Sequence, residues 1–221
     1  MQNHIQWGSK LAYAIGLIVT DGNLSPDGRH IDLTSKNIDL LETFMDCVGQ
    51  KVKVGKKKSG YTGKDCFRVQ IGNVELYKWL LNIGITPNKS KTIGSIGIPD
   101  NYLPDFLRGH IDGDGSFRIY QDAVYPNSQR IYTVFNSASK KHLIWLQDKI
   151  NKLLGIKGSI NPGKGVWKLE YAKKESLRLI PIIYYNSSVP CLKRKRETIE
   201  FILKKCRGEE LNLQGFDPAS S

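Results

Sequence analysis

The sequence has 221 residues, of which 40% are hydrophobic and 24% charged, and its formal net charge is +12. The apolar content is ordinary for a soluble globular protein, and the charge favours a polyanionic partner, either nucleic acid or an anionic membrane surface. The apolar run at 11–19 is too short to span a bilayer, and residues 1–10 lack the apolar region of a signal peptide. Nucleic acid is therefore the better candidate partner, and a membrane is not expected.

The four cysteines, Cys47, Cys66, Cys191 and Cys206, are irregularly spaced and include no C-x-x-C pair. This spacing argues against a zinc finger and against a secreted disulfide framework. We expect reduced thiols in an intracellular protein, in an organelle or in prokaryotic cytoplasm.

Hydrophobic periodicity and turn residues predict the elements in chain order. In the first half they are a helix over 11–21, a strand over 29–34, a helix over 38–48, a hairpin over 50–72 with a basic turn at 56–58, and a helix over 74–83. In the second half they are a helix over 103–114, strands over 117–120 and 131–136, a helix over 140–154, a hairpin over 157–171, a helix over 175–185, a basic segment over 189–196 and a helix over 197–206. Residues 207–221 form a polar tail.

The second half repeats the order of the first. LTSKNIDLL (33–41) aligns with NSASKKHLIWL (136–146), and TPNKSKT (86–92) aligns loosely with VPCLKRKRE (189–197). The chain is therefore a duplication of one α-β-β-α-β-β-α unit.

Two apolar runs, LAYAIGLIVTDG (11–22) and LPDFLRGHIDGDG (103–115), each end in Asp-Gly. Small residues lie one helical turn apart in both, at Gly16 and Thr20 and at Gly109 and Gly113. Positions i and i+4 share a helix face, and small side chains there let two helices approach closely. The spacing predicts that the two runs pack together, with a glycine stopping each helix.

Such packing would bring Asp21 and Asp114 together at the negative ends of two helix dipoles. Two carboxylates roughly 5 Å apart repel by about 3 kcal/mol at an effective dielectric near 20. Divalent cations, which prefer oxygen ligands, would offset this repulsion. The pair predicts a metal site shared by the two halves, whereas the plainer interpretation is two core helices that end in turns.

The segments AIGLIVTDG (14–22) and LRGHIDGDG (107–115) resemble the two copies of the nine-residue motif of the LAGLIDADG homing endonucleases, in their single-chain, monomeric type. The first copy departs from the motif at its sixth position, where Val19 replaces an acid. The acids of the eighth position, Asp21 and Asp114, are present in both copies.

The resemblance implies an α+β fold of two half-domains, residues 1–97 and 98–206, with the tail at 207–221. Each half would contribute an antiparallel sheet to a DNA-binding saddle, and the motif helices would pack at the pseudo-twofold interface. A monomer would suffice, with double-stranded DNA as partner and no protein partner required.

The resemblance also implies a site-specific endonuclease that makes a double-strand cut in a long asymmetric target, with short 3′ overhangs and Mg²⁺ as cofactor. Two or three divalent ions would be bound by Asp21 and Asp114, with the carbonyls of Thr20 and Gly113. Lys89 and Lys193 would be the catalytic cations. Lys91 and Lys195 compete with them, because the alignment there can slip by two residues.

A β-ribbon fits the major groove of DNA, so side chains on the two sheets and their margins would read the target. Strand alternation leaves only half of the candidates facing DNA. They are Arg29, Asp32, Thr34, Lys53, Arg68 and Gln70 in the first half, and Arg118, Tyr120, Arg130, Tyr132, Lys164, Trp167 and Lys168 in the second. Lys36 and Lys140 are candidates for contacts with phosphates or with solvent at the active site, and the plainer interpretation is that they only begin their helices.

Two other functions fit the same basic fold. One is an RNA-binding maturase that assists intron splicing, and the other is a DNA-binding regulator that has lost cleavage. Binding alone does not require two adjoining carboxylates, so the presence of both Asp21 and Asp114 favours the endonuclease.

Overall fold

The computed structural model of the chain describes residues 5–58, 63, 65–125 and 129–207, with the side chain of residue 207 excepted. The first half comprises α1 (Ser9–Asp21), β1 (Gly22–Leu24), β2 (His30–Ser35), α2 (Ile38–Val48), β3 (Gly55–Lys58), β4 (Asp65–Gly72), α3 (Val74–Asn82) and the 3-10 turn η1 (Lys89–Lys91). The second comprises η2 (Asp100–Tyr102), α4 (Leu103–Asp114), β5 (Ser116–Gln121), β6 (Gln129–Ser137), α5 (Lys140–Leu154), β7 (Ser159–Pro162), β8 (Trp167–Tyr171), α6 (Lys173–Ile183) and α7 (Lys193–Arg207).

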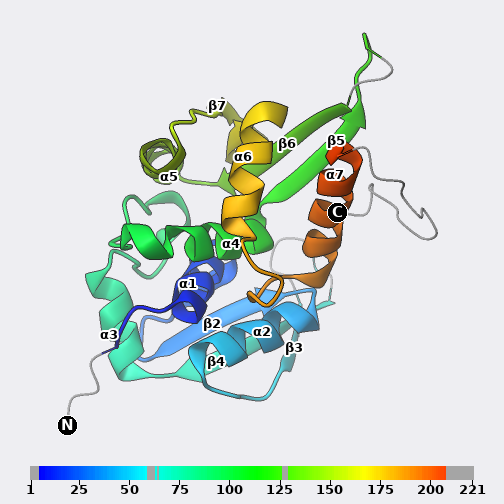
Figure 1. Cartoon of the computed structure of the whole chain (residues 1–221). Helices are drawn as coiled ribbons and strands as arrows, with labels where there is room; N and C mark the ends of the chain where they lie inside the picture. The colour runs from blue at the N-terminus through cyan, green and yellow to red at the C-terminus, as the bar shows by residue number, and fades with distance from the viewer. Residues whose placement is uncertain (1–4, 59–62, 64, 126–128, 208–221) are drawn as a thin grey trace.

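The predicted α+β fold with two antiparallel sheets is confirmed. The strand order is β1-β2-β4-β3 in one sheet and β5-β6-β8-β7 in the other, so the two sheets have equivalent topology. In Figure 1 the helices α1 and α4 lie side by side at the centre, with one sheet on either side of the pair.

The contact between α1 and α4 is a backbone contact. A Cβ atom built on Gly109 would lie 2.1 Å from the carbonyl oxygen of Tyr13, and one built on Gly16 would lie 2.4 Å from the carbonyl oxygen of Phe106. Near the helix ends, a Cβ on Gly113 would lie 1.9 Å from Oγ1 of Thr20. The small residues therefore set the separation of the two helices along their whole contact.

The glycine after each helix has a different role from the one expected. Gly22 and Gly115 have φ values of −89° and −87°, so neither adopts the left-handed conformation of a usual glycine stop. A Cβ would instead lie 2.6 Å from the Cα of Ile18 or of Ile111. Close approach of the chain to the preceding turn requires glycine at both positions.

One face of each sheet packs against helices, and the other is open. Along β2, Ile31 and Leu33 are fully buried, whereas the alternate residues Asp32 and Thr34 are half-buried on the opposite face. The two buried strand residues belong to the same hydrophobic core as α1 and α4. The period of two therefore gives each sheet a core face and a face on which polar side chains gather.

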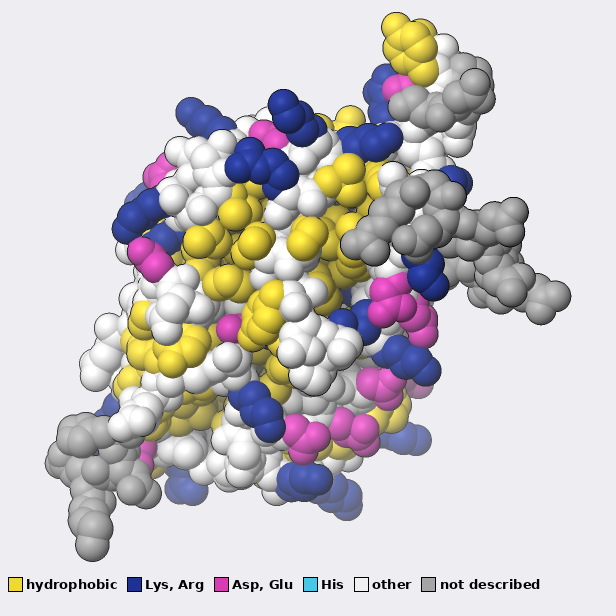
Figure 2. Space-filling view, in the orientation of Figure 1, with side chains coloured by type: hydrophobic (Ala, Val, Ile, Leu, Met, Phe, Trp, Pro, Cys, Tyr) yellow, Lys and Arg dark blue, Asp and Glu magenta, His cyan; other side chains and the backbone are white. Residues whose placement is uncertain are grey.

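Charge is distributed unevenly over the surface. Figure 2 shows acidic side chains at the lower right of the face that carries α2, α6 and α7, where α2 exposes Asp39, Glu42 and Asp46 and α7 exposes Glu197 and Glu200. Strand β3, of sequence GKKK, is exposed throughout on the first sheet. Part of the negative charge thus lies on the helical side of the molecule.

The predicted elements differ from the observed ones at several places. The basic segment 189–196 is not wholly a connection, because α7 begins at Lys193, four residues earlier than the helix predicted over 197–206. The backbone N–H groups of Lys195 and Arg196 donate to the carbonyl of Leu192, which starts this helix. The lysines at 56–58 lie on strand β3 rather than in a turn. The duplicated unit implies a strand directly after the first motif helix, for which no range was predicted, and β1 is that strand.

Most of the first hairpin turn and residues 208–221 of the predicted tail lie outside the described residues. Within the described ranges, no helix combines the length and the apolar character that crossing a membrane requires.

Two histidines are buried in the second half. The rings of His110 and His142 stack with their centroids 5.3 Å apart. Within the described residues, both nitrogens of His110 and Nε2 of His142 lack a hydrogen-bond partner, while Nδ1 of His142 lies 2.9 Å from the carbonyl oxygen of Gly94. Burial lowers the pKa of His142 to about 4 and holds the pKa of His110 well below its ordinary value. Burial therefore disfavours the charged form of both rings.

Substitution of a helix-contact glycine should separate α1 from α4. We expect Gly109→Ala to lower the free energy of unfolding by about 3 kcal/mol or more, because the added methyl group meets rigid backbone rather than a movable side chain. Urea unfolding followed by circular dichroism measures this loss. Gly94→Ala is the matched control, since a Cβ there meets nothing within 4 Å. Equal stability of the two variants would contradict the assigned contact.

Acid should destabilise the fold through the two histidines. A histidine with a depressed pKa stays neutral in the fold, so the unfolded chain binds the proton first and the free energy of unfolding falls between pH 6.5 and about 4. For His142 this loss is roughly 3 kcal/mol. We expect His142→Asn, which retains an N–H donor for Gly94, to flatten that part of the stability profile. An unchanged slope in urea unfolding across this pH range would refute the explanation.

Candidate functional site

The two motif aspartates lie at the paired ends of α1 and α4. Asp21 is the last residue of α1 and Asp114 the last of α4. Oδ2 of Asp21 would lie 3.1 Å from a Cβ built on Gly113, which shows how closely this carboxylate approaches the end of α4. The helix contact therefore places both carboxylates at one shared site, as the sequence predicts.

Each carboxylate is costly to ionise at this site. Burial, followed by the charge of Asp114, raises the pKa of Asp21 to about 7, although Lys195 and Lys89 act in the opposite direction. Burial also raises the pKa of Asp114, and the charges of Lys195 and Lys89 again oppose the shift. The pair therefore favours any ligand that brings additional positive charge.

Two buried lysines complete the site, one from each half. Nζ of Lys89 donates to the carbonyl of Gly22, and Nζ of Lys195 donates to the carbonyl of Gly115 at 2.8 Å. Gly22 and Gly115 follow the two aspartates, so the lysines occupy equivalent positions in the duplicated fold. Burial lowers the pKa of both lysines to about 8, and both aspartates partly oppose this shift.

The structure distinguishes between the competing lysines of the sequence alignment. Lys89 is 3% exposed and Lys195 is 4% exposed, and both reach the aspartates, whereas Lys91 and Lys193 are exposed. Lys193 is the first residue of α7 and points away from the buried side of that helix, on which Lys195 lies. The structure therefore places Lys195, and not Lys193, beside the aspartates.

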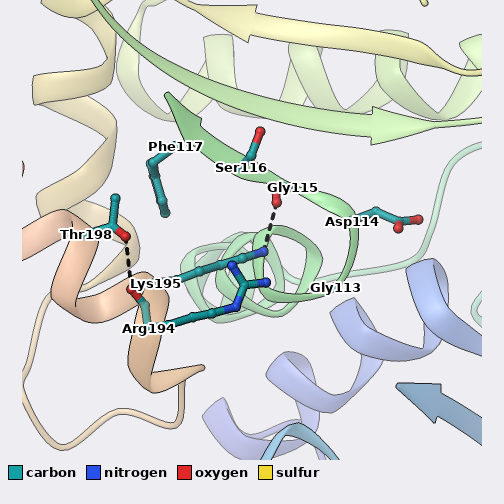
Figure 3. Close-up of a pocket in the computed structure, with 8 residues that line it drawn as sticks. All are labelled: Gly113, Asp114, Gly115, Ser116, Phe117, Arg194, Lys195 and Thr198. Atoms are coloured by element: carbon teal, nitrogen blue, oxygen red, sulfur yellow. Dashed lines mark hydrogen bonds between the residues drawn. The ribbon is translucent and has the colours of Figure 1, made fainter. Parts of the chain in front are cut away.

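A pocket of about 180 Å³ opens beside this half of the site. It is lined by residues 113–117 of the turn after α4 and by Arg194, Lys195 and Thr198 of α7. Figure 3 shows Lys195 and Arg194 extending from α7 beneath that turn, with Asp114 on its other side. Two cations of one helix therefore line the pocket, and the charge of Lys195 also acts on Asp114.

The donor set fits a hard divalent cation. Asp21 and Asp114 supply carboxylate oxygens, and the carbonyls of Thr20 and Gly113 belong to last helical turns, where a helix has no further N–H to offer them. No group of three or more His, Cys, Asp or Glu side chains within the described ranges could hold a metal. Mg²⁺ commonly uses only one or two carboxylates and completes its shell with water and substrate phosphate.

The candidate DNA-reading residues of the first half lie on or beside the open face of its sheet. Asp32 pairs with Gln70 and Thr34 with Arg68 across β2 and β4, and Arg68 forms an ion pair with Asp32 at 2.6 Å. A groove of about 450 Å³ runs beside them and is lined by Lys53 and by residues of β3. Arg29 and Lys36 are exposed at the two ends of β2.

In the second half, Tyr120 lies opposite Arg130 and Arg118 opposite Tyr132, and the two tyrosine rings stack at 5.7 Å. Lys164 is exposed in the turn between β7 and β8.

Trp167 lies on the other face of the sheet from these residues. It shares strand parity with the fully buried Leu169 and Tyr171, while Lys168 lies on the open face. Nζ of Lys140 lies 4.5 Å from the centre of the Trp167 ring. The pair Lys140 and Trp167 therefore joins the start of α5 to the sheet on the helical side, and not on the face where DNA contacts were expected.

Asn136 is a site residue that the sequence did not reveal. Its side-chain amide donates to the backbone carbonyl of Asp114 across the sheet. Strand alternation could have found it, because Asn136 lies near the end of β6 and on the same strand face as Tyr132, which is one of the candidate DNA-reading residues.

The fold is that of the LAGLIDADG homing endonucleases. The endonuclease I-WcaI bound to its DNA recognition sequence is similar over 87% of this chain and 88% of its own, with a TM-score of 0.59 and 14% identity. The endonuclease I-DmoI in complex with DNA and Mn is similar over 80% of this chain and 97% of its own, with a TM-score of 0.51 and 16% identity.

The N-terminal LAGLIDADG domain of DUF199/WhiA has the same fold, with a TM-score of 0.55, 18% identity and 90% of each chain covered. The chain spans 63% of full-length DUF199/WhiA from Thermatoga maritima. No protein-family model and no curated protein sequence matches this chain.

Neutralising one carboxylate should stabilise the protein in the absence of divalent ions. The pKa of Asp21 is raised to about 7, so near pH 8 this carboxylate is charged and its charge opposes folding. We expect Asp21→Asn to raise the free energy of unfolding by at least about 1 kcal/mol. Millimolar Mg²⁺ should raise the melting temperature of the unmodified protein and leave that of Asp21→Asn unchanged. An equal rise of the melting temperature in both proteins would show that Mg²⁺ does not bind at Asp21.

Proposed function

We propose that this protein is a metal-dependent DNA endonuclease that cuts both strands of a long asymmetric target. The observation that carries the proposal is the pair of equivalent half-sites at the helix ends. Each half-site combines one aspartate with one buried lysine, Asp21 with Lys89 and Asp114 with Lys195. Two adjoining half-sites suit a duplex, which presents one scissile phosphate on each strand.

Hydrolysis of a phosphodiester forms a bond from a water oxygen to phosphorus and breaks the bond from phosphorus to the 3′ oxygen. The products are a 5′ phosphate and a 3′ hydroxyl, which receives a proton. Divalent cations supply activation of water and stabilisation of charge on the phosphate when they are bound. Asp21 and Asp114 would hold these cations, with the carbonyls of Thr20 and Gly113.

Lys89 and Lys195 would stabilise the charge that develops on the phosphate. Each ammonium is fixed by a main-chain carbonyl, so it is oriented before the substrate arrives and need not reorganise during the reaction. Burial removes competing water, which strengthens its interaction with an anion. Neither lysine bonds to a carboxylate through these contacts, so the aspartate oxygens stay available to cations.

The open faces of the two sheets would bind the duplex. Arg68 and Gln70 on the first sheet, and Arg118 and Tyr120 on the second, would present donors or rings to the major groove. The lysines of β3 would contact phosphates and make the affinity dependent on salt.

Cleavage selection tests the proposal. The purified chain is incubated with Mg²⁺ and a random duplex library, and cut ends are sequenced; we expect them to converge on one asymmetric site with short 3′ overhangs. Asp21→Asn and Asp114→Asn, or EDTA, should abolish cutting while DNA binding persists. Tight binding to duplex DNA without cutting would favour a regulator, and selective binding to structured RNA would favour a maturase.

The two candidate lysines of α7 provide a matched comparison. We expect Lys195→Met to reduce the cleavage rate on the selected target by about 10²-fold or more, because a fixed charge beside the phosphate is lost. Lys193→Met removes the same charge from an exposed position and should change the rate by less than about threefold. Gel assays of single-turnover cleavage measure both rates. A larger loss in Lys193→Met would show that the catalytic cation is misassigned.

A further inference from the structure

The acid at the sixth position of the second motif, Asp112, is buried and does not face the shared site. It is 2% exposed, and its counterpart in the first motif is Val19. Because α1 tolerates valine at this position, packing of the two helices does not require a carboxylate there. A buried acid is costly unless its oxygens are paired, so its partners indicate its role.

Three groups donate to the Asp112 carboxylate. The hydroxyl of Tyr13 donates to Oδ2 at 2.8 Å, and the hydroxyl of Tyr184 donates to Oδ1 at 3.0 Å. The backbone N–H of Leu192 donates to Oδ2 at 2.6 Å. Two of the three donors, Tyr184 and Leu192, thus belong to the segment that connects α6 to α7.

These bonds form part of a closed ring with Lys195. Asp112 accepts from the N–H of Leu192, and the carbonyl of Leu192 accepts from the N–H of Lys195 at 3.0 Å. Nζ of Lys195 then returns to the carbonyl of Asp112 at 3.1 Å, and it also donates to the carbonyls of Ile111 and Gly115. The ring ties the first turn of α7 to the last turn of α4.

Arg108, one helical turn before Asp112, fixes the same connection. Its side chain is fully buried, and it donates to the carbonyl of Ile183 at 2.6 Å and to the carbonyl of Pro190 at 2.7 Å. The first half has Ile15 at this position. Arg108 and Asp112, two of the polar groups that hold the connection, are therefore specific to the second half.

Among the residues that the structure describes, no side chain of α1 forms a hydrogen bond to the turn that carries Lys89. Its own backbone carbonyl accepts from the N–H groups of Thr92 and Ile93, at 2.9 and 2.8 Å, within the 3-10 turn that carries it. The local turn thus orients Lys89, whereas Lys195 depends on contacts with α4.

We propose that Asp112 is a positioning residue that fixes the start of α7 through Leu192 and thereby holds Lys195 in the shared site. The proposal deepens the proposed endonuclease function, on which its catalytic consequence rests. Its structural consequence, the burial of Lys195, can be measured without DNA.

Lysine labelling tests the structural consequence. The full chain is treated with acetic anhydride near pH 8, and acetylation of each lysine is measured by mass spectrometry. We expect Lys195 and Lys89 to be protected in the unmodified protein, with Lys193 labelled. Asp112→Val, which copies the first motif, should expose Lys195 and leave Lys89 protected. Asp112→Asn, which keeps an acceptor for Leu192, should restore protection of Lys195. Protection of Lys195 in a folded Asp112→Val protein would overturn the proposal.

If Asp112→Val does not fold, hydrogen exchange in the unmodified protein tests the hydrogen bond between Leu192 and Asp112. Hydrogen exchange of the Leu192 amide in the unmodified protein should be as slow as that of the buried amides of α4. Exchange at the rate of an exposed loop would refute the anchoring bond and the proposal with it.

Kinetics on a selected target test the catalytic consequence. We expect Asp112→Val to lower kcat by about 10-fold to 10²-fold with little change in KM, because displaced Lys195 acts on the reaction rather than on DNA binding. Asp112→Asn should stay within about threefold of the unmodified protein. An equal loss in both variants, with Lys195 labelled in neither, would overturn the positioning role. If the unmodified protein cuts no DNA, the endonuclease proposal fails and the labelling result still decides the role of Asp112.

Discussion

The backbone contact between α1 and α4 determines the rest of the structure. Gly16 and Gly109 allow each helix to meet the main chain of the other, so the helix ends cannot separate without breaking the contact. That geometry brings Asp21 and Asp114 together and leaves each sheet on its own side of the pair. The position of the acids therefore follows from packing, and the cost of ionising them follows from their position.

The arrangement of the two lysines separates charge stabilisation from ligand binding. An ammonium bonded directly to Asp21 or Asp114 would neutralise a carboxylate and occupy its oxygens. Lys89 and Lys195 bond instead to the glycine carbonyls that follow the acids, while their charges still lower the cost of ionisation. In the proposed endonuclease, the buried site would thus keep two carboxylates for cations and two ammonium groups for an anion.

The sequence predicts those parts of the fold that depend on local periodicity. The bounds of α2 and α5, the small residues of the helix contact and the paired acids follow from spacing within a few turns. The choice of Lys195 does not, because it depends on connections of different length: Lys89 lies two residues after Pro87, whereas Lys195 lies five after Pro190. Extending the predicted final helix towards its N-terminus would have favoured Lys195 over Lys193, since Lys195 falls on the buried face of α7 with Ile199 and Ile202. Strand parity would likewise have assigned Trp167 to the core side.

The differences between the halves show what duplication preserves. Helix packing acts on both motifs alike, so Gly16 and Gly109 match, as do the acids that end each helix. The two buried lysines reach equivalent points from connections that are not equivalent, and each half uses its own contacts to hold its lysine. A short 3-10 turn suffices for Lys89, whereas α4 needs Arg108 and Asp112 to hold the longer connection before Lys195. The two half-sites are therefore alike in the groups that they present and unlike in what holds those groups in place.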